Sequence, residues 1–434
     1  MIFNSIKEKI LMNNLKHKNI NFINLLIAFI IPFLIWGPFF PDLIVSVSAL
    51  FFLFYVFKNK KFYFFNNKPL IIFFIFCIYC ILLSVFVAED RMLSFENSLF
   101  YFRIGVFSCF IWYLINRDKS ILTYFYYALV LCFSVLVIDG YFQYFTGVNL
   151  FGSKISGVRV SSFFGEELIM GSYLSRLFPL LFALFLLKQK QKYEIYFIGL
   201  LFIFVDVLIF MTGERTAFFF LNLSTIFIII LIKEYQKFRL ATFLIAIICV
   251  FVLSLNAPTL SNRMFKGPAE DLGLIGNSQK SAIFSSIHDS LFRTAYNMFI
   301  DQPLFGHGPK MFRVICRDKK YAVGRSPCTT DPHSSATIHP HNLYLQLLAE
   351  TGIIGFLFLL SAFIYVLYTA LRQFKSIIFQ QKRPLTDYQV CLLAGILISV
   401  WPFSPNGNFF SNWLMMVYSL PVGLYIQSIY SKKT

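Results

Sequence analysis

Histidine is distributed unevenly along the chain. Five of the six histidines lie between residues 258 and 342 of a 434-residue sequence: His288, His307, His333, His339 and His341. An imidazole titrates near neutral pH, so it can take up or release a proton during a reaction at an aqueous surface. Loops collect polar residues in general, and this ordinary explanation is sufficient for His288, His307 and His333. His341 differs because of its neighbours.

The residues around His341 indicate a fixed position at the start of an apolar helix. Pro340 restricts the backbone before it, and Asn342 can cap the helix that follows. Gly352 and Gly355 come later on a similar face of that helix. Their small size permits close packing of a neighbouring helix or a lipid chain. The sequence therefore predicts an imidazole held at the edge of this helix.

Charged residues also lie inside long apolar stretches, where they are costly and are usually functional or paired. These residues are Arg103, Asp139, Arg176, Asp206 and Glu350. Glu350 should face a partner or a water-filled cavity and not lipid. Arg176 could bind an anion, with Asp139 or Asp206 as its partner or as a proton carrier. The sequence does not choose between these roles, and it leaves the role of Arg103 open.

The elements that would position these side chains are membrane helices. The chain is 58% hydrophobic and 14% charged, with 57 phenylalanines spread over long apolar runs, which excludes an ordinary soluble domain. Runs of about 18 or more apolar residues match the ~30 Å hydrocarbon core of a bilayer. The sequence predicts an all-α polytopic membrane protein of about twelve spans. They lie near 20–38, 41–57, 69–88, 98–115, 121–145, 169–187, 194–211, 216–232, 240–257, 343–371, 388–403 and 412–429.

The basic residues indicate how these spans are oriented. One set of alternate loops, together with both termini, holds 22 of the 38 Lys and Arg residues. Basic residues collect in cytoplasmic loops, so both termini should be cytoplasmic, and the net charge of +17 needs no nucleic acid as a partner. This orientation divides the chain into a first bundle of nine spans (1–257), an outer loop domain (258–342) and three last spans (343–434).

The outer loop domain should be mostly helical. Residues 278–300 read as an amphipathic helix with Ile283, Ile287, Leu291 and Tyr296 on one side. Cys316 and Cys328 are the two cysteines of this domain, and they should form a disulfide if it lies in an oxidising periplasm. The spacing of its histidines and cysteines fits no standard zinc site, so no metal site is expected.

The stretch from His341 to Gly355 resembles the signature of the O-antigen ligase and O-antigen polymerase superfamily, bacterial inner-membrane glycosyltransferases that act on lipid-linked glycans. The ligase signature is a histidine followed by Asn, Ser or Gln, then nine residues, then Gly-x-x-Gly. His341-Asn342 and Gly352-Ile353-Ile354-Gly355 match it in full. Further likeness, strongest over about 200–360, comes from residues 212–216 (TGERT), 293–296 (RTAY) and 303–308 (PLFGHG).

The resemblance implies that Arg215, Arg293 and His341 are required for activity. The donor would be a glycan on undecaprenyl diphosphate, and the acceptor would be lipid A–core or a similar glycan, with membrane lipids around both. Guanidinium groups match phosphate oxygens with a two-pronged fork. His341 would accept the proton of an acceptor hydroxyl, in an inverting displacement that needs neither a metal nor a cofactor. Further contacts with substrate are expected from Arg176, His339, Asn342, Glu350, Gly352 and Gly355.

Three functions stay open at this point. The first is a ligase, and the second is a polymerase that uses lipid-linked repeat units as donor and acceptor; some superfamily members glycosylate protein instead. The third is a transporter, because intramembrane charges often mark a transport pathway. Transporters commonly contain internal repeats, of which this chain has none, and transport does not explain an outer loop of 85 residues. Convergence of Arg215, Arg293 and His341 on one outward cavity would favour glycan transfer.

Overall fold

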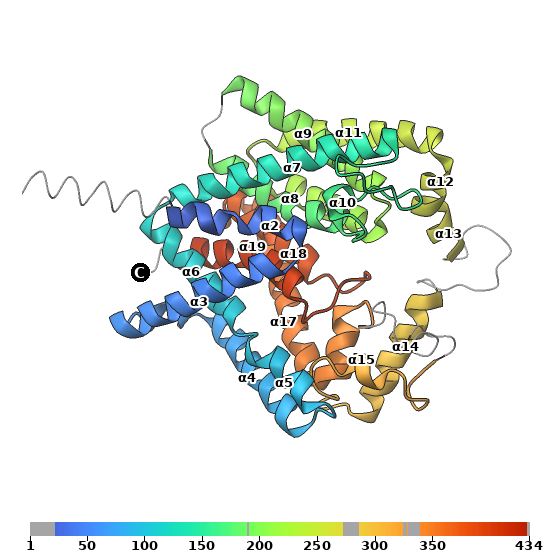
Figure 1. Cartoon of the computed structure of the whole chain (residues 1–434). Helices are drawn as coiled ribbons and strands as arrows, with labels where there is room; N and C mark the ends of the chain where they lie inside the picture. The colour runs from blue at the N-terminus through green and yellow to red at the C-terminus, as the bar shows by residue number, and fades with distance from the viewer. Residues whose placement is uncertain (1–21, 189–190, 272–285, 324–327, 329–338, 432–434) are drawn as a thin grey trace, which may run out of the picture.

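The computed structural model describes residues 22–188, 191–271, 286–323, 328 and 339–431. These residues form an all-α fold without β-strands (Figure 1). The predicted fold class is therefore confirmed. The helices are α2 (Ile30–Trp36), α3 (Phe39–Asn59), α4 (Lys68–Phe86), α5 (Arg91–Leu99), α6 (Arg103–Arg117), α7 (Ser120–Thr146), α8 (Met170–Leu187), α9 (Lys192–Met211), α10 (Arg215–Leu231), α11 (Gln236–Asn256), α12 (Pro258–Ser261), α13 (Gly267–Asp271), α14 (Ser286–Asp301), α15 (Phe312–Ile315), α17 (Leu343–Gln380), α18 (Asp387–Ser399) and α19 (Asn412–Tyr430).

Within the described ranges, eight helices are long and apolar enough to cross a membrane. They are α3, α4, α7, α8, α9, α11, α17 and the stretch Arg91–Arg117, which contains α5 and α6. Three apolar helices are shorter: Phe22–Trp36, α10 and α18. A described helix overlaps each of the twelve ranges predicted from the sequence, although α18 ends at Ser399, before the end of the range 388–403. The multi-pass character is thus supported, whereas the number twelve and the side of each loop stay predictions.

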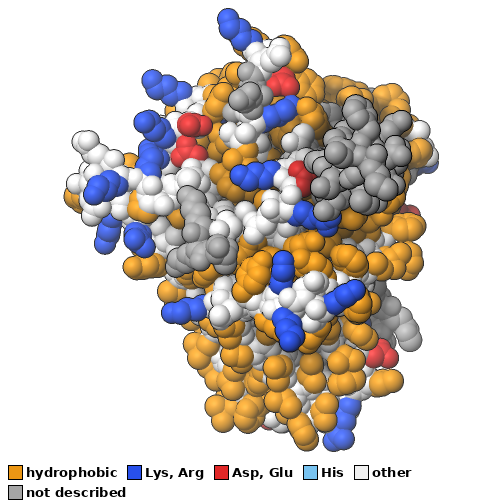
Figure 2. All heavy atoms as spheres, turned by 90° about the vertical axis from the view of Figure 1, so that its left-hand side faces the viewer, with side chains coloured by type: hydrophobic (Ala, Val, Ile, Leu, Met, Phe, Trp, Pro, Cys, Tyr) orange, Lys and Arg blue, Asp and Glu red, His pale blue; other side chains and the backbone are white. Residues whose placement is uncertain are grey.

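Helix α8 is the centre of the bundle. Almost all of its side chains are buried, and α7, α9, α10 and α18 pack around it. The outer helices instead expose large apolar side chains, as α3 does with Leu50 and Phe54. Such faces contact lipid in a membrane protein. Figure 2 shows the side of the molecule that lies at the left of Figure 1. Most charged side chains on this side are Lys or Arg, and a broad hydrophobic region lies below them.

The charged residues inside the helices have polar partners, some of them charged and some neutral. Arg239 of α11 is fully buried and binds both carboxylate oxygens of Asp206 of α9, at 2.8 and 3.1 Å. Arg103 pairs with Asp42, and the Asp139 carboxylate accepts hydrogen bonds from the Leu150 backbone and the Ser162 hydroxyl. The idea that Asp139 or Asp206 is the partner of Arg176 is therefore wrong. Arg176 donates to Asn406 instead.

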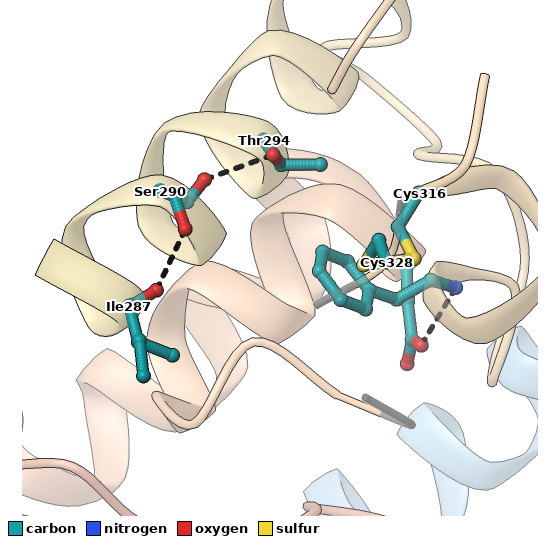
Figure 3. The surroundings of a disulfide bond; sticks show 7 residues. Ile287, Ser290, Thr294, Cys316 and Cys328 are labelled. Atoms are coloured by element: carbon teal, nitrogen blue, oxygen red, sulfur yellow. Dashed lines mark hydrogen bonds between the residues drawn. A yellow bond between two sulfur atoms is a disulfide. The ribbon is translucent and has the colours of Figure 1, made fainter. Parts of the chain in front are cut away.

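The described part of 258–342 is mostly helical: α12 packs against α11, and α14 and α15 pack against α17. Helix α14 turns Leu291, Ala295 and Met298 inward, while Ile287 and Tyr296 are more than half exposed. The predicted side is therefore buried at Leu291, while Ile287, one turn before it on the same side, is exposed at the helix start, and Tyr296 lies off the buried face. Ile283 lies outside the described residues. Figure 3 shows α14 beside the disulfide between Cys316 and Cys328, the pairing expected from the sequence.

We expect the Cys316→Ser variant to weaken the outer domain by about 3 kcal/mol, because the disulfide closes a loop of 12 residues. Limited proteolysis of the purified protein should then cut this domain faster than in the wild type. The Cys249→Ser variant is a matched control, since Cys249 is an exposed free cysteine on α11. Equal cleavage rates for Cys316→Ser and Cys249→Ser would contradict the expectation.

Candidate functional site

A large cavity lies between the membrane helices and the outer domain. Its volume is about 1820 Å³, and its wall combines the ends of α2 and α10, part of α8, one face of α14, residues 339–341 and the loop between α18 and α19. Its described lining holds six Lys or Arg residues and two Glu residues. The basic residues are Arg159, Arg176, Arg215, Arg263, Lys310 and Arg313, and His288, His339 and His341 join them. This excess of cations suits an anionic substrate.

Three of these arginines meet around the turn at Gly213, and we call Arg159, Arg215 and Arg263 the arginine cluster. Gly213 has a positive φ of 65°, and a side chain there would press on Arg159 and Arg263. The Arg263 Nε donates to the Gly213 carbonyl at 3.0 Å, and the Arg159 Nε donates to the Thr212 carbonyl at 3.2 Å. The Arg215 Nε donates to the Arg263 carbonyl at 2.8 Å. Backbone carbonyls thus fix all three guanidinium groups.

The electrostatics of the arginine cluster favour a bound anion. Burial lowers the pKa of Arg159 and of Arg263, and the nearby charge of Arg215 lowers the pKa of Arg263 further. A guanidinium nevertheless stays protonated in proteins. Like charges are therefore held together here, and an anion such as a phosphate would relieve their repulsion.

Glu214, which precedes Arg215, has structural partners of its own. Its carboxylate accepts hydrogen bonds from the backbone of Gly171 and Ser172, at 2.7 and 3.1 Å, and from the Ser172 hydroxyl at 2.9 Å. These donors belong to the first turn of α8, so the carboxylate caps that helix. Burial raises the pKa of Glu214, while Ser172 and Arg159 lower it.

His341 is held from both sides. Its backbone has a positive φ of 56°, and its carbonyl accepts a hydrogen bond from the Asn406 backbone at 2.7 Å. Asn342 caps α17 through the backbone of Tyr344 and Leu345, at 3.0 and 3.1 Å, which confirms the predicted cap. The Asn342 amide also donates to the Pro402 carbonyl at 2.9 Å. The backbone from which the His341 side chain projects is therefore fixed at the cavity wall.

Two further imidazoles lie against His341. Its ring centre is 4.2 Å from that of His339 and 5.5 Å from that of His288 on α14. Burial, with a smaller contribution from the charge of His341, lowers the pKa of His339 to about 3. His339 is thus neutral near pH 7. His333, the remaining histidine of the outer loop, lies outside the described residues.

Arg293 is not among the residues that line the cavity. Its Nε pairs with Asp289 at 2.8 Å on the same helix, and its side chain is largely exposed. Helix α14 turns Ile287 and His288 toward the cavity, and Arg293 lies more than one turn further along it. The structure therefore brings Arg215 and His341 to one cavity without Arg293. A direct role of Arg293 in the site stays a prediction.

Glu350 and the two motif glycines lie behind the residues that line the cavity. The buried Glu350 carboxylate accepts hydrogen bonds from the Phe312 backbone at 3.1 Å and from Gln346 at 3.0 Å. Gly355 faces α4, where an added Cβ would lie 3.5 Å from Phe76. Asn342, Glu350, Gly352 and Gly355 are all absent from the described cavity lining, so their expected contact with substrate also stays a prediction.

Gly352 interrupts α17 with a positive φ of 63°, where an added Cβ would overlap the Leu304 carbonyl. The interruption leaves two carbonyls for the preceding loop: Ala349 accepts from the His307 backbone at 3.0 Å, and Glu350 accepts from the Gly308 backbone at 2.8 Å. The close partner of Gly352 is thus a loop backbone and not a helix or lipid, and the N–H groups of that loop satisfy the two carbonyls.

Sequence reasoning missed several residues of the cavity wall. Arg159 and Arg263 carry no motif and reach the cavity only through tertiary contacts. Lys310 and Arg313 follow soon after the 303–308 segment. Their closeness to that motif could have identified them as candidates for the site. Burial lowers the pKa of Lys310 to about 8, and its ammonium group donates to the Asn97 side chain.

Comparison with known families confirms the resemblance. Residues 198–360 match the family model described as O-antigen ligase, and no curated protein matches the sequence. The matched region contains Arg215, Arg263, Lys310, Arg313 and His341, which all line the cavity. The match supports glycan transfer of the ligase or polymerase type, with lipid-linked glycans as substrates, by a multi-pass membrane protein.

Proposed function

We propose that this protein is an O-antigen ligase-like glycosyltransferase that moves a glycan from undecaprenyl diphosphate to a hydroxyl group of lipid A–core or a similar acceptor. The reaction takes place at the periplasmic face of a bacterial inner membrane, with both termini in the cytoplasm. The observation that carries this proposal is one cavity lined by both His341 and the arginine cluster, within a chain that matches the ligase family over 198–360.

The proposed step is a single displacement at the anomeric carbon. The acceptor oxygen forms a bond to that carbon as the bond to the diphosphate oxygen breaks. His341 takes the proton of the acceptor hydroxyl, and the departing diphosphate carries the bonding electron pair into the arginine cluster. The anomeric configuration is inverted. The arginines supply the positive charge that the leaving group needs, so the proposal requires no metal ion.

The test is reconstitution of the purified protein in lipid with a defined undecaprenyl-diphosphate glycan and two acceptors. Transfer to lipid A–core identifies a ligase, whereas extension of a second lipid-linked glycan identifies a polymerase. A protein acceptor is tested in the same way. Failure to transfer the glycan to any of these three acceptors counts against the proposal. A role of Arg293 in the reaction is proposed from the resemblance alone. The transfer rate of Arg293→Gln in the same assay measures that role.

We expect Arg215→Gln to lower the transfer rate by about 10²–10³-fold, because it removes a positioned cation from the developing negative charge. The rate of product formation at saturating acceptor measures this effect. Arg372→Gln is the matched control, since Arg372 is an exposed arginine of α17 outside the cavity. Equal rates for Arg215→Gln and Arg372→Gln would remove the arginine cluster from the mechanism.

A further inference from the structure

A second group of polar side chains lies in the wall of the same cavity, and some of its polar atoms have no partner within the described residues. The side chains are Arg176, His339, Ser404 and Asn406, each between 4 and 8% exposed. The unpaired atoms are the Arg176 Nε and Nη1, the Asn406 Nδ2 and the Ser404 Oγ, and the His339 ring lies beside the Asn406 backbone. Buried polar groups in proteins are nearly always hydrogen-bonded, so a set of unpaired donors on one cavity indicates a missing ligand.

The donors of this group are held in position. The Asn406 Oδ1 accepts from the Arg176 Nη2 at 2.8 Å and from the Gly407 backbone at 2.9 Å. These two bonds fix the amide, so its NH₂ group cannot turn toward Arg176. The guanidinium of Arg176 also lies over the rings of Phe220 and Tyr418, at 4.8 and 5.5 Å. Its remaining nitrogens and the Asn406 amide form a preorganised set of donors.

The chemistry of this group selects an oxyanion. Arg176 carries a permanent positive charge, and the Asn406 NH₂ can only donate. Ser404 can donate as well, and the neutral imidazole of His339 supplies one N–H. A phosphate group has several acceptor oxygens and a negative charge, which match donors arranged around one guanidinium.

The group is separate from the arginine cluster. The cluster surrounds Gly213 and is fixed by carbonyls of residues 212, 213 and 263. Arg176 projects from α8, and its partner Asn406 belongs to the loop between α18 and α19. Asn406 also bonds to the His341 carbonyl through its backbone. One cavity therefore contains two sets of cationic donors, of which the second is bonded to the segment that carries the proposed base.

We propose that Arg176, His339, Ser404 and Asn406 form a second oxyanion subsite, which binds a phosphate group of a substrate glycan while the arginine cluster binds the donor diphosphate. This inference rests on the proposed function for the identity of the glycan. Its anion-binding part can be tested without turnover. The phosphate group belongs to the acceptor or to the donor, and the two sources predict different kinetic results.

The binding test uses inorganic phosphate and the purified full chain in lipid nanodiscs made of a neutral phospholipid. Thermal stabilisation by phosphate is compared in Arg215→Gln and in Arg215→Gln/Asn406→Asp. Aspartate has nearly the size of asparagine, but its carboxylate neutralises Arg176 and replaces a donor with an acceptor. We expect phosphate to bind at least about tenfold more weakly to the double variant.

Equal phosphate affinity in these two variants would overturn the subsite. Asn256→Asp in the Arg215→Gln background is the matched control, because the Asn256 side chain bonds only to its own helix, at the exposed end of α11. It should leave phosphate binding unchanged. The melting temperature without phosphate shows in addition that Asn406→Asp is folded.

The kinetic test identifies which substrate carries the phosphate. If it belongs to the acceptor, Asn406→Asp should raise the KM for a phosphorylated acceptor about tenfold and leave the KM for the dephosphorylated acceptor unchanged. If it belongs to the donor, the KM for the donor should rise instead. An unchanged KM for all three substrates would show that no substrate uses the subsite. Loss of all transfer with intact phosphate binding would count against the proposed function alone.

Discussion

His341→Ala should lower the rate of glycan transfer by about 10²–10⁴-fold, the range typical of a lost general base. The acceptor hydroxyl is a weak nucleophile until its proton is removed. The backbone carbonyl of His341 accepts a hydrogen bond from the loop of the second oxyanion subsite, and the next residue, Asn342, caps α17. The measurement is the single-turnover rate with donor and acceptor bound, because that rate reports the chemical step and not product release.

Two variants separate chemistry from structure in this experiment. His341→Gln keeps a polar side chain of similar reach but cannot take up a proton at neutral pH, so it should be nearly as slow as His341→Ala. His288→Gln changes the imidazole that lies against His341 at 5.5 Å and should retain most of the rate. Wild-type rates for both His341 variants, in correctly inserted protein, would show that another group accepts the proton.

Asp206→Ala should lower the stability of the helix bundle by about 3–5 kcal/mol. The substitution leaves the Arg239 guanidinium, which is fully buried, with Thr225 and Thr242 as neutral partners only. A buried charge without a counter-charge is strongly unfavourable, above all between membrane helices. Unfolding of the purified protein by heat or denaturant in detergent measures the loss.

The exposed pair of Arg293 and Asp289 provides a matched comparison. Its N–O distance is 2.8 Å, the same as the shorter distance between Arg239 and Asp206, but both side chains are exposed to solvent. Asp289→Ala should therefore change stability by about 0–1 kcal/mol. Replacement of the buried pair by Asp206→Leu with Arg239→Met should recover most of the stability. Equal effects of Asp206→Ala and Asp289→Ala would contradict this account.

The membrane helices could be predicted because each apolar run is a local property of the sequence. The cap of α17 could be predicted for the same reason, since Asn342 and the N–H groups that it binds lie within three residues of one another. The pairing of Asp206 with Arg239 could not, because the two residues are 33 positions apart and lie on different helices. The sequence alone allows each arginine of these spans to pair with any of several carboxylates.

The candidate site was predictable only where motif and geometry coincide. Arg215 and His341 belong to matched motifs and line the cavity, while Arg293 belongs to a motif and pairs with Asp289 outside it. Arg176 was noticed as a charge within a span, but its partner Asn406 lies 230 positions away. Loop residues of this kind acquire a role through the fold, and no local pattern marks them.

The backbone contact at Gly352 has a consequence for how the outer segment can vary. The chain is anchored to α17 where His307 and Gly308 bond to Ala349 and Glu350, and it rejoins the same helix at Asn342. Residues 309–340 therefore leave and rejoin a single helix. The first anchor consists of main-chain bonds and the second of the Asn342 cap, so sequence changes between them, outside Lys310, Phe312 and Arg313, need not displace the imidazole of His341. A chimaera that exchanges this segment for that of a related chain is thus expected to keep both attachments to α17.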